Sequence, residues 1–206
     1  MTEISLAGLN VSRETFNRLT LLQSMLEKWN PAINLVAKST LPDAWTRHIV
    51  DSAQLMTLAP ASVLHWADLG SGGGFPGLVV AALSAERDPQ RRITLVESDQ
   101  RKATFLRQAA RELGLLKVTV LAERIETLSP LAADVLSARA LAALPQLCHF
   151  ALRHLSPTGL ALFPKGAQHL DEVAQARHDW HFDLSTFPSD TDPAAVVLAM
   201  KAIQHV

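Results

Sequence analysis

The sequence predicts an α/β fold: a mostly parallel, twisted sheet with helices on both faces, closed by an antiparallel hairpin and preceded by a helical extension. After Pro60, short apolar runs alternate with longer helical patterns, and strands separated by helices usually pair in parallel. Near the end of the sequence, two apolar runs are joined by a short turn, which is typical of a hairpin. We therefore expect a helical extension over residues 1–60 and one compact unit over residues 61–206.

The extension shows helical periodicity. Over residues 12–29, apolar side chains recur every three or four positions, so one face of the predicted helix is buried. Asn30-Pro31 is expected to stop this helix, because proline lacks the backbone N–H that a helix needs. A second helix is expected over residues 42–58, ending before Pro60.

Strands and helices are expected to alternate after Pro60. Predicted strands cover residues 63–69, 93–96, 118–121, 134–137 and 159–163. Predicted helices cover residues 75–85, 101–113, 140–155 and 170–177. The hairpin pairs 182–187 with 194–203 across a turn at 189–193, which makes the last strand antiparallel. A parallel sheet that ends in such a hairpin resembles the class I Rossmann-like methyltransferase fold rather than a dehydrogenase.

Composition and charge leave the partner open. The 206 residues suffice for one well-packed domain. The net charge of −1 neither supports nor excludes an RNA partner, since contacts would come from local basic patches. The single cysteine, Cys148, allows no internal disulfide, and neither a signal peptide nor a membrane-spanning apolar run is evident. We expect a monomeric cytoplasmic protein with no membrane association and, because the eight histidines lack metal-ligand spacing, no metal.

A glycine-rich segment follows the first predicted strand of the sheet. Asp68 ends that strand, and Gly70, Gly72, Gly74 and Gly77 follow it. Ligands of open α/β sheets bind beyond the strand ends, and glycine lets the backbone approach a ligand closely. A plain surface turn would not require several glycines between a strand and a helix. The segment therefore predicts a ligand-binding loop.

Two classes of adenosyl cofactor fit the loop. Gly72, Gly74 and Gly77 also satisfy the G-x-G-x-x-G pattern of dinucleotide sites. A dinucleotide lays its anionic pyrophosphate on the N-terminus of the following helix, where Asp68 would repel it. S-adenosylmethionine carries a sulfonium and an ammonium group, which a carboxylate favours. We therefore expect S-adenosylmethionine as the cofactor and S-adenosylhomocysteine as its product.

Glu97 ends the second strand of the sheet. An acidic residue there can accept hydrogen bonds from both ribose hydroxyls of an adenosyl ligand. Both cofactor classes carry that ribose, so Glu97 supports a nucleoside ligand without choosing between them.

Motifs along nearly the whole chain resemble one family. They are Asn34-Leu35-Val36, Arg47-His48-Ile49-Val50-Asp51-Ser52, Gly70 to Gly77 with its Phe75-Pro76, Glu97-Ser98, Arg101-Lys102, Arg124-Ile125-Glu126, Ser137-Ala138-Arg139-Ala140 and Lys165-Gly166. The sequence resembles the RsmG family, also called glucose-inhibited division protein B, of 16S rRNA guanine-N7 methyltransferases. The Gly-Phe-Pro-Gly ending of the loop and the Arg-His-x-x-Asp-Ser segment are its most specific features.

The resemblance implies an activity and roles for single residues. The activity is methylation of N7 of the guanine at position 527 of 16S rRNA, near the decoding site. Gly70 and Phe75 match cofactor-loop positions of the family, and Ile125 and Glu126 match the segment along the adenine. Arg139 matches a further cofactor position, where the methyl group would meet its acceptor.

Guanine N7 carries a lone pair and no proton at neutral pH, so no general base is proposed. Catalysis would then consist mainly of positioning in a site that excludes water. Arg139 is our hypothesis for orienting the base through O6 or a flanking phosphate; the alternative is a structural salt bridge to Asp134 or Glu126. Lys165 is our hypothesis for a phosphate contact, against an ordinary exposed lysine.

Three residues ahead of the loop are interpreted as structural. Arg47 and Asp51 stand four positions apart and can pair on a helix, and His48 is more often a packed histidine than a ligand. The set would brace the N-terminal helices over the glycine loop.

Other functions stay open at the level of sequence. They are an NAD-dependent oxidoreductase, a small-molecule methyltransferase, and a protein that binds the cofactor without transferring its methyl group. The substrate of the favoured function is 16S rRNA, whether free, in the small ribosomal subunit or in its precursor.

Overall fold

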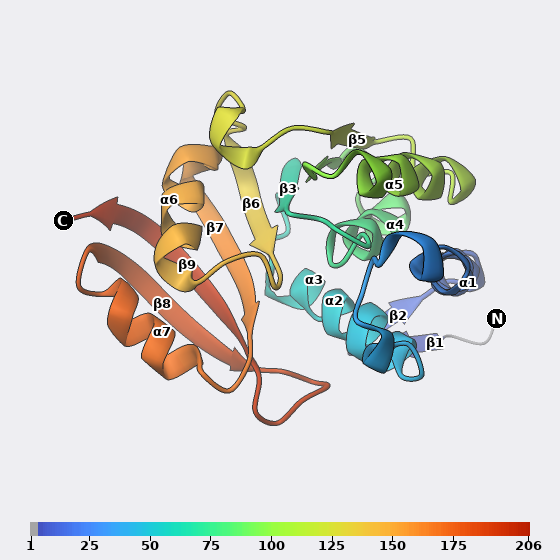
Figure 1. The fold of residues 1–206 in the computed structure, drawn as a ribbon, viewed down its shortest axis with the longest axis horizontal. Coiled ribbons are helices and arrows are strands. Elements are labelled where there is room, and N and C mark those ends of the chain that lie inside the picture. The colour runs from blue at the N-terminus through green and yellow to red at the C-terminus, as the bar shows by residue number, and fades with distance from the viewer. Residues whose placement is uncertain (1–3) are drawn as a thin grey trace.

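The computed structural model describes residues 4–206; residues 1–3 of the predicted extension lie outside the described part of the chain. Seven strands form one sheet in the order β5-β4-β3-β6-β7-β9-β8 (Figure 1). Their bounds are β3 His65–Leu69, β4 Arg92–Val96, β5 Val118–Leu121, β6 Ala133–Ala138, β7 Leu155–Lys165, β8 Trp180–Pro188 and β9 Val196–His205. The first five are parallel, and β9 runs antiparallel to β7 and β8. The predicted fold class is confirmed.

Helices cover both faces of the sheet. On one side lie α1 (Arg13–Ile33), α4 (Gly77–Arg87) and α5 (Gln100–Glu112), and on the other lie α6 (Leu144–His154) and α7 (His169–Ala176) (Figure 1). Alternate strand residues enter two separate cores: Trp66 packs into the first and Leu69 into the second. The alternation is the period-two pattern of a sheet buried on both faces.

The N-terminal part holds a hairpin that was not predicted. Strands β1 (Ile4–Leu6) and β2 (Leu9–Val11) pair with each other, apart from the main sheet. Each has only three residues, which is too short for periodicity to distinguish it from a loop. Helix α1 follows, capped by the Ser12 hydroxyl, which accepts a hydrogen bond from the Thr15 N–H at 3.1 Å.

The predicted stop at Asn30-Pro31 is wrong, because α1 continues through Pro31 to Ile33. The proline costs one hydrogen bond close to the helix end, where few further bonds depend on it. Asn30 lies within the helix, and its side-chain oxygen accepts a hydrogen bond from the Val36 N–H at 2.8 Å. Asn34 then ends the helix in the left-handed conformation, with a φ of 51°.

The second predicted helix, 42–58, is broken into shorter pieces. A 3₁₀ turn, η1 (Lys38–Thr40), precedes a π-helical turn, η2 (Trp45–Val50), followed by α2 (Asp51–Ala53) and α3 (Leu55–Leu58). The Ser52 hydroxyl donates to the His48 carbonyl at 2.5 Å within this segment. Wide π turns are rare and occur frequently at functional sites.

The other boundaries differ from prediction by a few residues. Helix α6 starts at Leu144 rather than at residue 140, which leaves 139–143 as a loop after β6. Strand β7 begins directly after α6 and is longer than the predicted 159–163. None of the helices within residues 4–206 is long and apolar enough to span a membrane.

Candidate cofactor and substrate site

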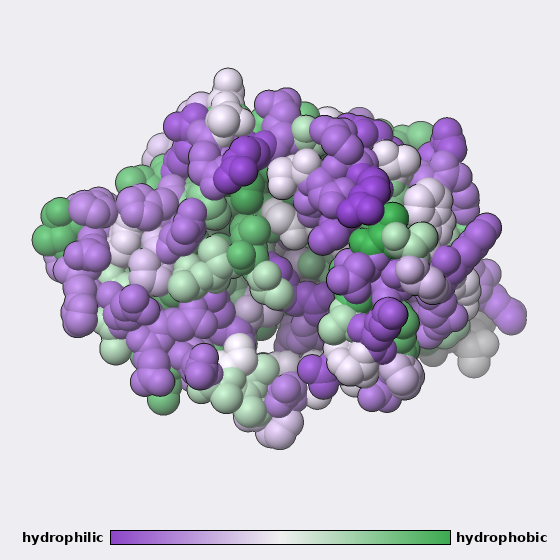
Figure 2. All heavy atoms as spheres, in the orientation of Figure 1, coloured by the Kyte–Doolittle hydropathy of each residue, from purple (hydrophilic) through white to green (hydrophobic). Residues whose placement is uncertain are grey.

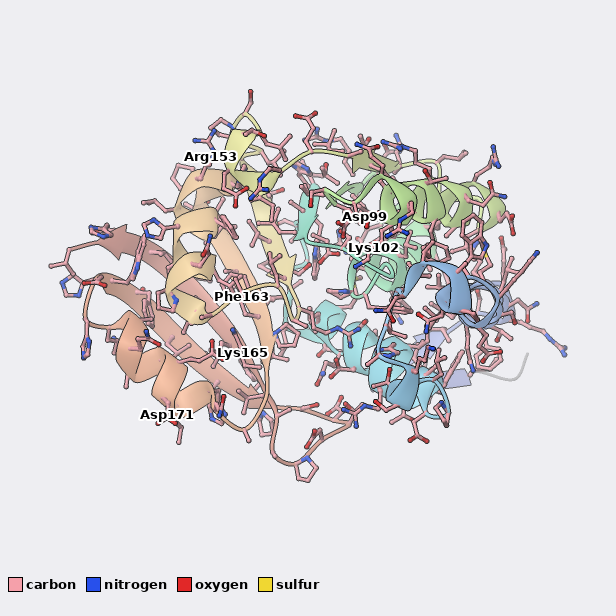
Figure 3. All side chains as sticks on the ribbon, in the orientation of Figure 1. Asp99, Lys102, Arg153, Phe163, Lys165 and Asp171 are labelled. Atoms are coloured by element: carbon pink, nitrogen blue, oxygen red, sulfur yellow. The ribbon has the colours of Figure 1, made fainter. Side chains whose placement is uncertain are left out.

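A cavity of about 1310 Å³ lies at the carboxyl ends of the central strands. The segments after β3, β4 and β6 contribute Gly70, Glu97 and Arg139 to its wall, and the last residue of β7 contributes Lys165. Figure 2 shows the hollow near the middle of the drawn face, and Figure 3 shows Lys102 of α5 and Lys165 of β7 on either side of it. The strand order brings together residues that are far apart in the sequence, at the edge where ligands of α/β sheets bind.

Asp68 lies under the glycine loop and does not line the cavity. Its carboxylate is fully buried and accepts hydrogen bonds from the Ser137 hydroxyl at 2.7 Å and the Gly77 N–H at 3.2 Å. Gly77 is the first residue of α4, so the carboxylate occupies the helix N-terminus that would hold the pyrophosphate of a dinucleotide. Any effect of Asp68 on a ligand in the cavity would therefore be exerted through the loop rather than by direct contact.

The loop itself presents backbone to the cavity. Gly70 and Gly72 line the wall together with Phe75, while Gly74 does not. Gly70 has a φ of 63°, and a Cβ there would lie 3.2 Å from Leu141 Cγ. A side chain at that position would also displace the Leu141 side chain, which extends from the loop after β6.

Glu97 lies beside the glycine loop in the cavity wall, with 8% of its surface exposed. One carboxylate oxygen accepts the Gly72 N–H at 2.9 Å, and the other accepts the Asp99 N–H at 2.8 Å. A carboxylate offers about four acceptor positions, so each oxygen keeps one for a further donor. Ile125 and Glu126, just after β5, line the same end of the cavity.

Arg139 is held by three protein acceptors. Its guanidinium donates to the Asp51 carboxylate at 3.2 Å, to the Arg47 carbonyl at 2.9 Å and to His48 Nδ1 at 2.9 Å. The carbon of the guanidinium also lies 5.6 Å from the centre of the Phe75 ring. The side chains of Arg139 and Asp51 are only 18% and 14% exposed. Arg139 is thus fixed in orientation at the cavity wall.

The partners of Arg139 differ from those proposed from the sequence. Asp134 instead accepts the backbone N–H groups of Leu64 and His65, and Glu126 lies 3.6 Å from Arg124. The ion pairs among the described residues include Arg139–Asp51 and none between Arg47 and Asp51. Arg47 contributes its carbonyl oxygen rather than its charge.

His48 links the extension to the glycine loop. Because arginine only donates, His48 Nδ1 must accept, which leaves the proton on Nε2 to donate to the Thr40 hydroxyl at 2.9 Å. The His48 ring stacks on Phe75 with centroids 5.1 Å apart. Burial, followed by the charges of Arg139 and Arg47, lowers the pKa of His48 to about 4. The predicted bracing role of this segment agrees with these contacts.

The tip of the C-terminal hairpin also reaches this cluster, which the sequence did not suggest. Asp51 accepts hydrogen bonds from the hydroxyls of Ser189 at 3.4 Å and Thr191 at 3.2 Å. Nearby, Gln54 accepts the Asp190 N–H at 3.1 Å. Serine, threonine and aspartate before a proline are ordinary turn residues, so composition alone could not reveal the second role.

Lys165 is not an exposed lysine. Its side chain is 9% exposed and donates to the Ala142 carbonyl at 2.9 Å and to the Glu172 carboxylate at 2.6 Å. The partner Glu172, on α7, also lines the cavity and was not predicted. Cys148 is buried in α6, where burial raises the pKa of its thiol to about 12 and so disfavours the nucleophilic thiolate. Within residues 4–206, no three His, Cys, Asp or Glu side chains gather to hold a metal.

Comparison with known proteins decides the family. Residues 15–191 match the family described as GidB, rRNA small subunit methyltransferase G. The chain belongs to this family. It is 56% identical to a ribosomal RNA small subunit methyltransferase G of Cereibacter sphaeroides over the whole of both chains. It is 54% identical to that of Ruegeria pomeroyi, over 96% of each chain.

A solved structure agrees on the fold. A SAM-dependent methyltransferase from Aquifex aeolicus superimposes with a TM-score of 0.60 at 13% identity, covering 86% of this chain and 97% of the other. The predicted family resemblance and the methyltransferase fold are therefore confirmed, and an oxidoreductase is not favoured. The roles of the single site residues remain predictions.

The site implies opposite pH dependences for two buried groups. Burial raises the pKa of Asp68 to about 6, although its hydrogen bonds to Ser137, Ser71 and Gly77 oppose the change. Between about pH 4 and pH 6 the folded state keeps a proton that the unfolded state has lost, so stability falls as pH rises, by about 3 kcal/mol in total. His48 has the reverse sign, because its lowered pKa makes stability rise from about pH 4 to 6.5.

We therefore expect the wild-type protein to show a shallow net pH dependence from these two groups. Relative to the wild type, urea unfolding of Asp68→Asn should show stability rising more steeply with pH across that window, because the opposing Asp68 contribution is gone. His48→Gln should change the slope in the opposite direction, because the His48 contribution that raises stability with pH is gone. Parallel curves for all three proteins would contradict the assignment.

Proposed function

We propose that this protein is an S-adenosylmethionine-dependent methyltransferase that methylates N7 of the guanine at position 527 of 16S rRNA. The observation that carries the proposal is full-length similarity to proteins named ribosomal RNA small subunit methyltransferase G. The SAM-dependent methyltransferase among the structural relatives supports the cofactor. The N7 specificity and the position within the rRNA come from the family resemblance.

The residues of the cavity fit this cofactor. Gly70, Gly72 and Phe75 would border it, Glu97 would accept its ribose hydroxyls, and Ile125 and Glu126 would lie along its adenine. The buried Asp68 carboxylate at the start of α4 favours a cationic ligand above the loop and disfavours a pyrophosphate. When bound, S-adenosylmethionine supplies a methyl group made electrophilic by its sulfonium.

The chain's own task is to position the guanine and exclude water. The N7 lone pair needs no deprotonation, so a site without a general base suffices. Arg139 uses three N–H groups on Arg47, His48 and Asp51 and has five in all. Its remaining two N–H groups are available to hold O6 or a phosphate of the substrate, from a guanidinium that is already fixed.

The substrate would be 16S rRNA, free or within the small ribosomal subunit or its precursor, and the protein would act as a cytoplasmic monomer. Near-zero net charge is compatible with RNA because single basic residues can contact phosphates locally. Arg47 and Lys102 line the cavity, and neither takes part in an ion pair among the described residues. Their charges would attract a phosphate of the RNA backbone whatever the total charge of the protein.

The test is to map 7-methylguanine in 16S rRNA from cells with and without the gene. We expect the modification at position 527 to disappear without the gene and to return with the purified protein and S-adenosylmethionine. Its persistence in the deletion strain would refute the substrate assignment. A thermal-shift comparison should show stabilisation by S-adenosylmethionine and none by NAD.

A further inference from the structure

The end of the cavity near β7 holds a charged pair whose hydrogen-bonding capacity is only partly used. Lys165 ends β7, and β6 separates that strand from β3, which leads into the glycine loop. Two strand spacings, about 10 Å, therefore lie between the two regions. This distance places the Lys165–Glu172 pair beyond the cofactor loop, on the side left for a substrate.

One N–H donor of Lys165 and one carboxylate oxygen of Glu172 take part in no hydrogen bond with the described residues. An ammonium has three N–H donors. Lys165 donates one to the Ala142 carbonyl and one to Glu172 Oε2, which leaves one N–H without a partner among the described residues. Glu172 Oε2 also accepts the Leu144 N–H at 2.9 Å. Glu172 Oε1 accepts no hydrogen bond from any residue that the structure describes. The Glu172 side chain is 25% exposed, so this oxygen has room for a ligand.

The charge of the pair selects the kind of ligand. Glu172 neutralises Lys165, so the pair attracts a phosphate weakly. A neutral molecule with an acceptor beside a donor would complement it on both sides. Apolar side chains at the same end of the cavity, including Leu141, Phe150 and Pro164, suit a flat heterocycle.

We propose that Lys165 and Glu172 read the Watson–Crick edge of the substrate guanine. The free N–H of Lys165 would donate to O6, and Glu172 Oε1 would accept from N1–H and from the N2 amino group. Adenine presents a donor at C6 and an acceptor at N1, so the same pair rejects it. Enzymes that act on an extruded base commonly read this edge. It leaves N7 free for methyl transfer.

This inference rests on the proposed function for its substrate, and it changes the role proposed for Lys165 from a phosphate contact to a base contact. The assignment makes both residues specificity determinants rather than members of the reacting group. Arg139 is a separate part of the cavity wall, after β6, where Arg47 and Asp51 of the N-terminal part bind its guanidinium.

The test measures nucleotide binding by calorimetry to the full-length protein saturated with S-adenosylhomocysteine. The ligands are GMP and the 5′-monophosphate of 2,6-diaminopurine riboside, which lacks O6 and N1–H but keeps N7. We expect the wild type to prefer GMP by about 10- to 100-fold. Glu172→Gln and Lys165→Met should each bring the two affinities within about threefold. Asp171→Asn, one residue away on α7 and outside the cavity wall, should keep the full preference.

Two results would overturn the proposal. One is a wild-type protein that binds the two nucleotides equally well, or a Glu172→Gln variant that keeps the full wild-type preference for GMP. The other is a Lys165→Met variant that weakens GMP but not guanosine, which would assign Lys165 to phosphate. Lys165→Arg keeps a donor and should retain the preference, which separates recognition from misfolding. Because binding needs no methyl transfer, failure of the rRNA assay and failure of this assay are distinct outcomes.

Discussion

Replacing Arg139 with alanine is expected to lower kcat/KM for methyl transfer by about 100-fold, the size of effect that follows loss of substrate positioning. The substitution removes the guanidinium that faces the cavity and is held by Asp51, Arg47 and His48. It also leaves the Asp51 carboxylate, 14% exposed, without its cation. We expect unfolding to become easier by about 1–3 kcal/mol for that reason.

The control for this variant is Arg139→Lys, which keeps the charge. A lysine ammonium lacks the planar fork that reaches three acceptors at once. Stability should therefore recover more than activity does. Methyl transfer at the wild-type rate by a normally folded Arg139→Ala protein would contradict the positioning role.

Replacing Gly77 with alanine is expected to cost about 1–3 kcal/mol of stability, as overpacking of a core does. The new Cβ would meet a Leu95 methyl group, and it would lie 2.7 Å from Asp68 Oδ2 and 3.0 Å from Asp68 Cβ. It would thus displace the carboxylate that holds the start of α4. Affinity for S-adenosylmethionine should fall as well, because the loop above Asp68 loses its anchor.

Gly166→Ala is the matched control. Apart from its two neighbours in the chain, no residue has an atom within 4 Å of a Cβ built at Gly166, so the unfolding free energy should not fall. Chemical denaturation and calorimetric titration with S-adenosylmethionine measure both effects. Equal stability of the Gly77→Ala and Gly166→Ala proteins would disprove the close packing around Asp68.

Much of the fold could be predicted because its main elements are locally encoded. Strand β7 contains a continuous apolar run over residues 160–163, and α5 carries a clear amphipathic pattern. The N-terminal segment was harder, because its structure depends on partners far away in the sequence. Pro31 is accommodated near a helix end, and the π turn at Trp45–Val50 forms where His48 and Asp51 meet Arg139.

The site residues likewise divide into those with a local sequence signal and those whose roles depend on partners far away in the sequence. Glycines and acidic residues at strand ends carry a local signal, so Gly70 and Glu97 could be placed at the cavity in advance, while Ile125 was placed there by the family resemblance. Glu172 and Thr191 carry none, since one is an ordinary helix residue and the other an ordinary turn residue. Their roles arise only when the fold brings α7 beside the end of β7 and the hairpin tip beside Asp51.

The position of β9 has a consequence for synthesis. It lies between β7 and β8, although it is the last of the seven strands to leave the ribosome. Until then, β7 has an open edge and β8 has no partner in the sheet. The hairpin tip that bonds to Asp51 cannot close either. A chain released before Val196 would therefore expose the unpaired edge of β7. We expect a nascent chain to stay inactive until β9 inserts between β7 and β8.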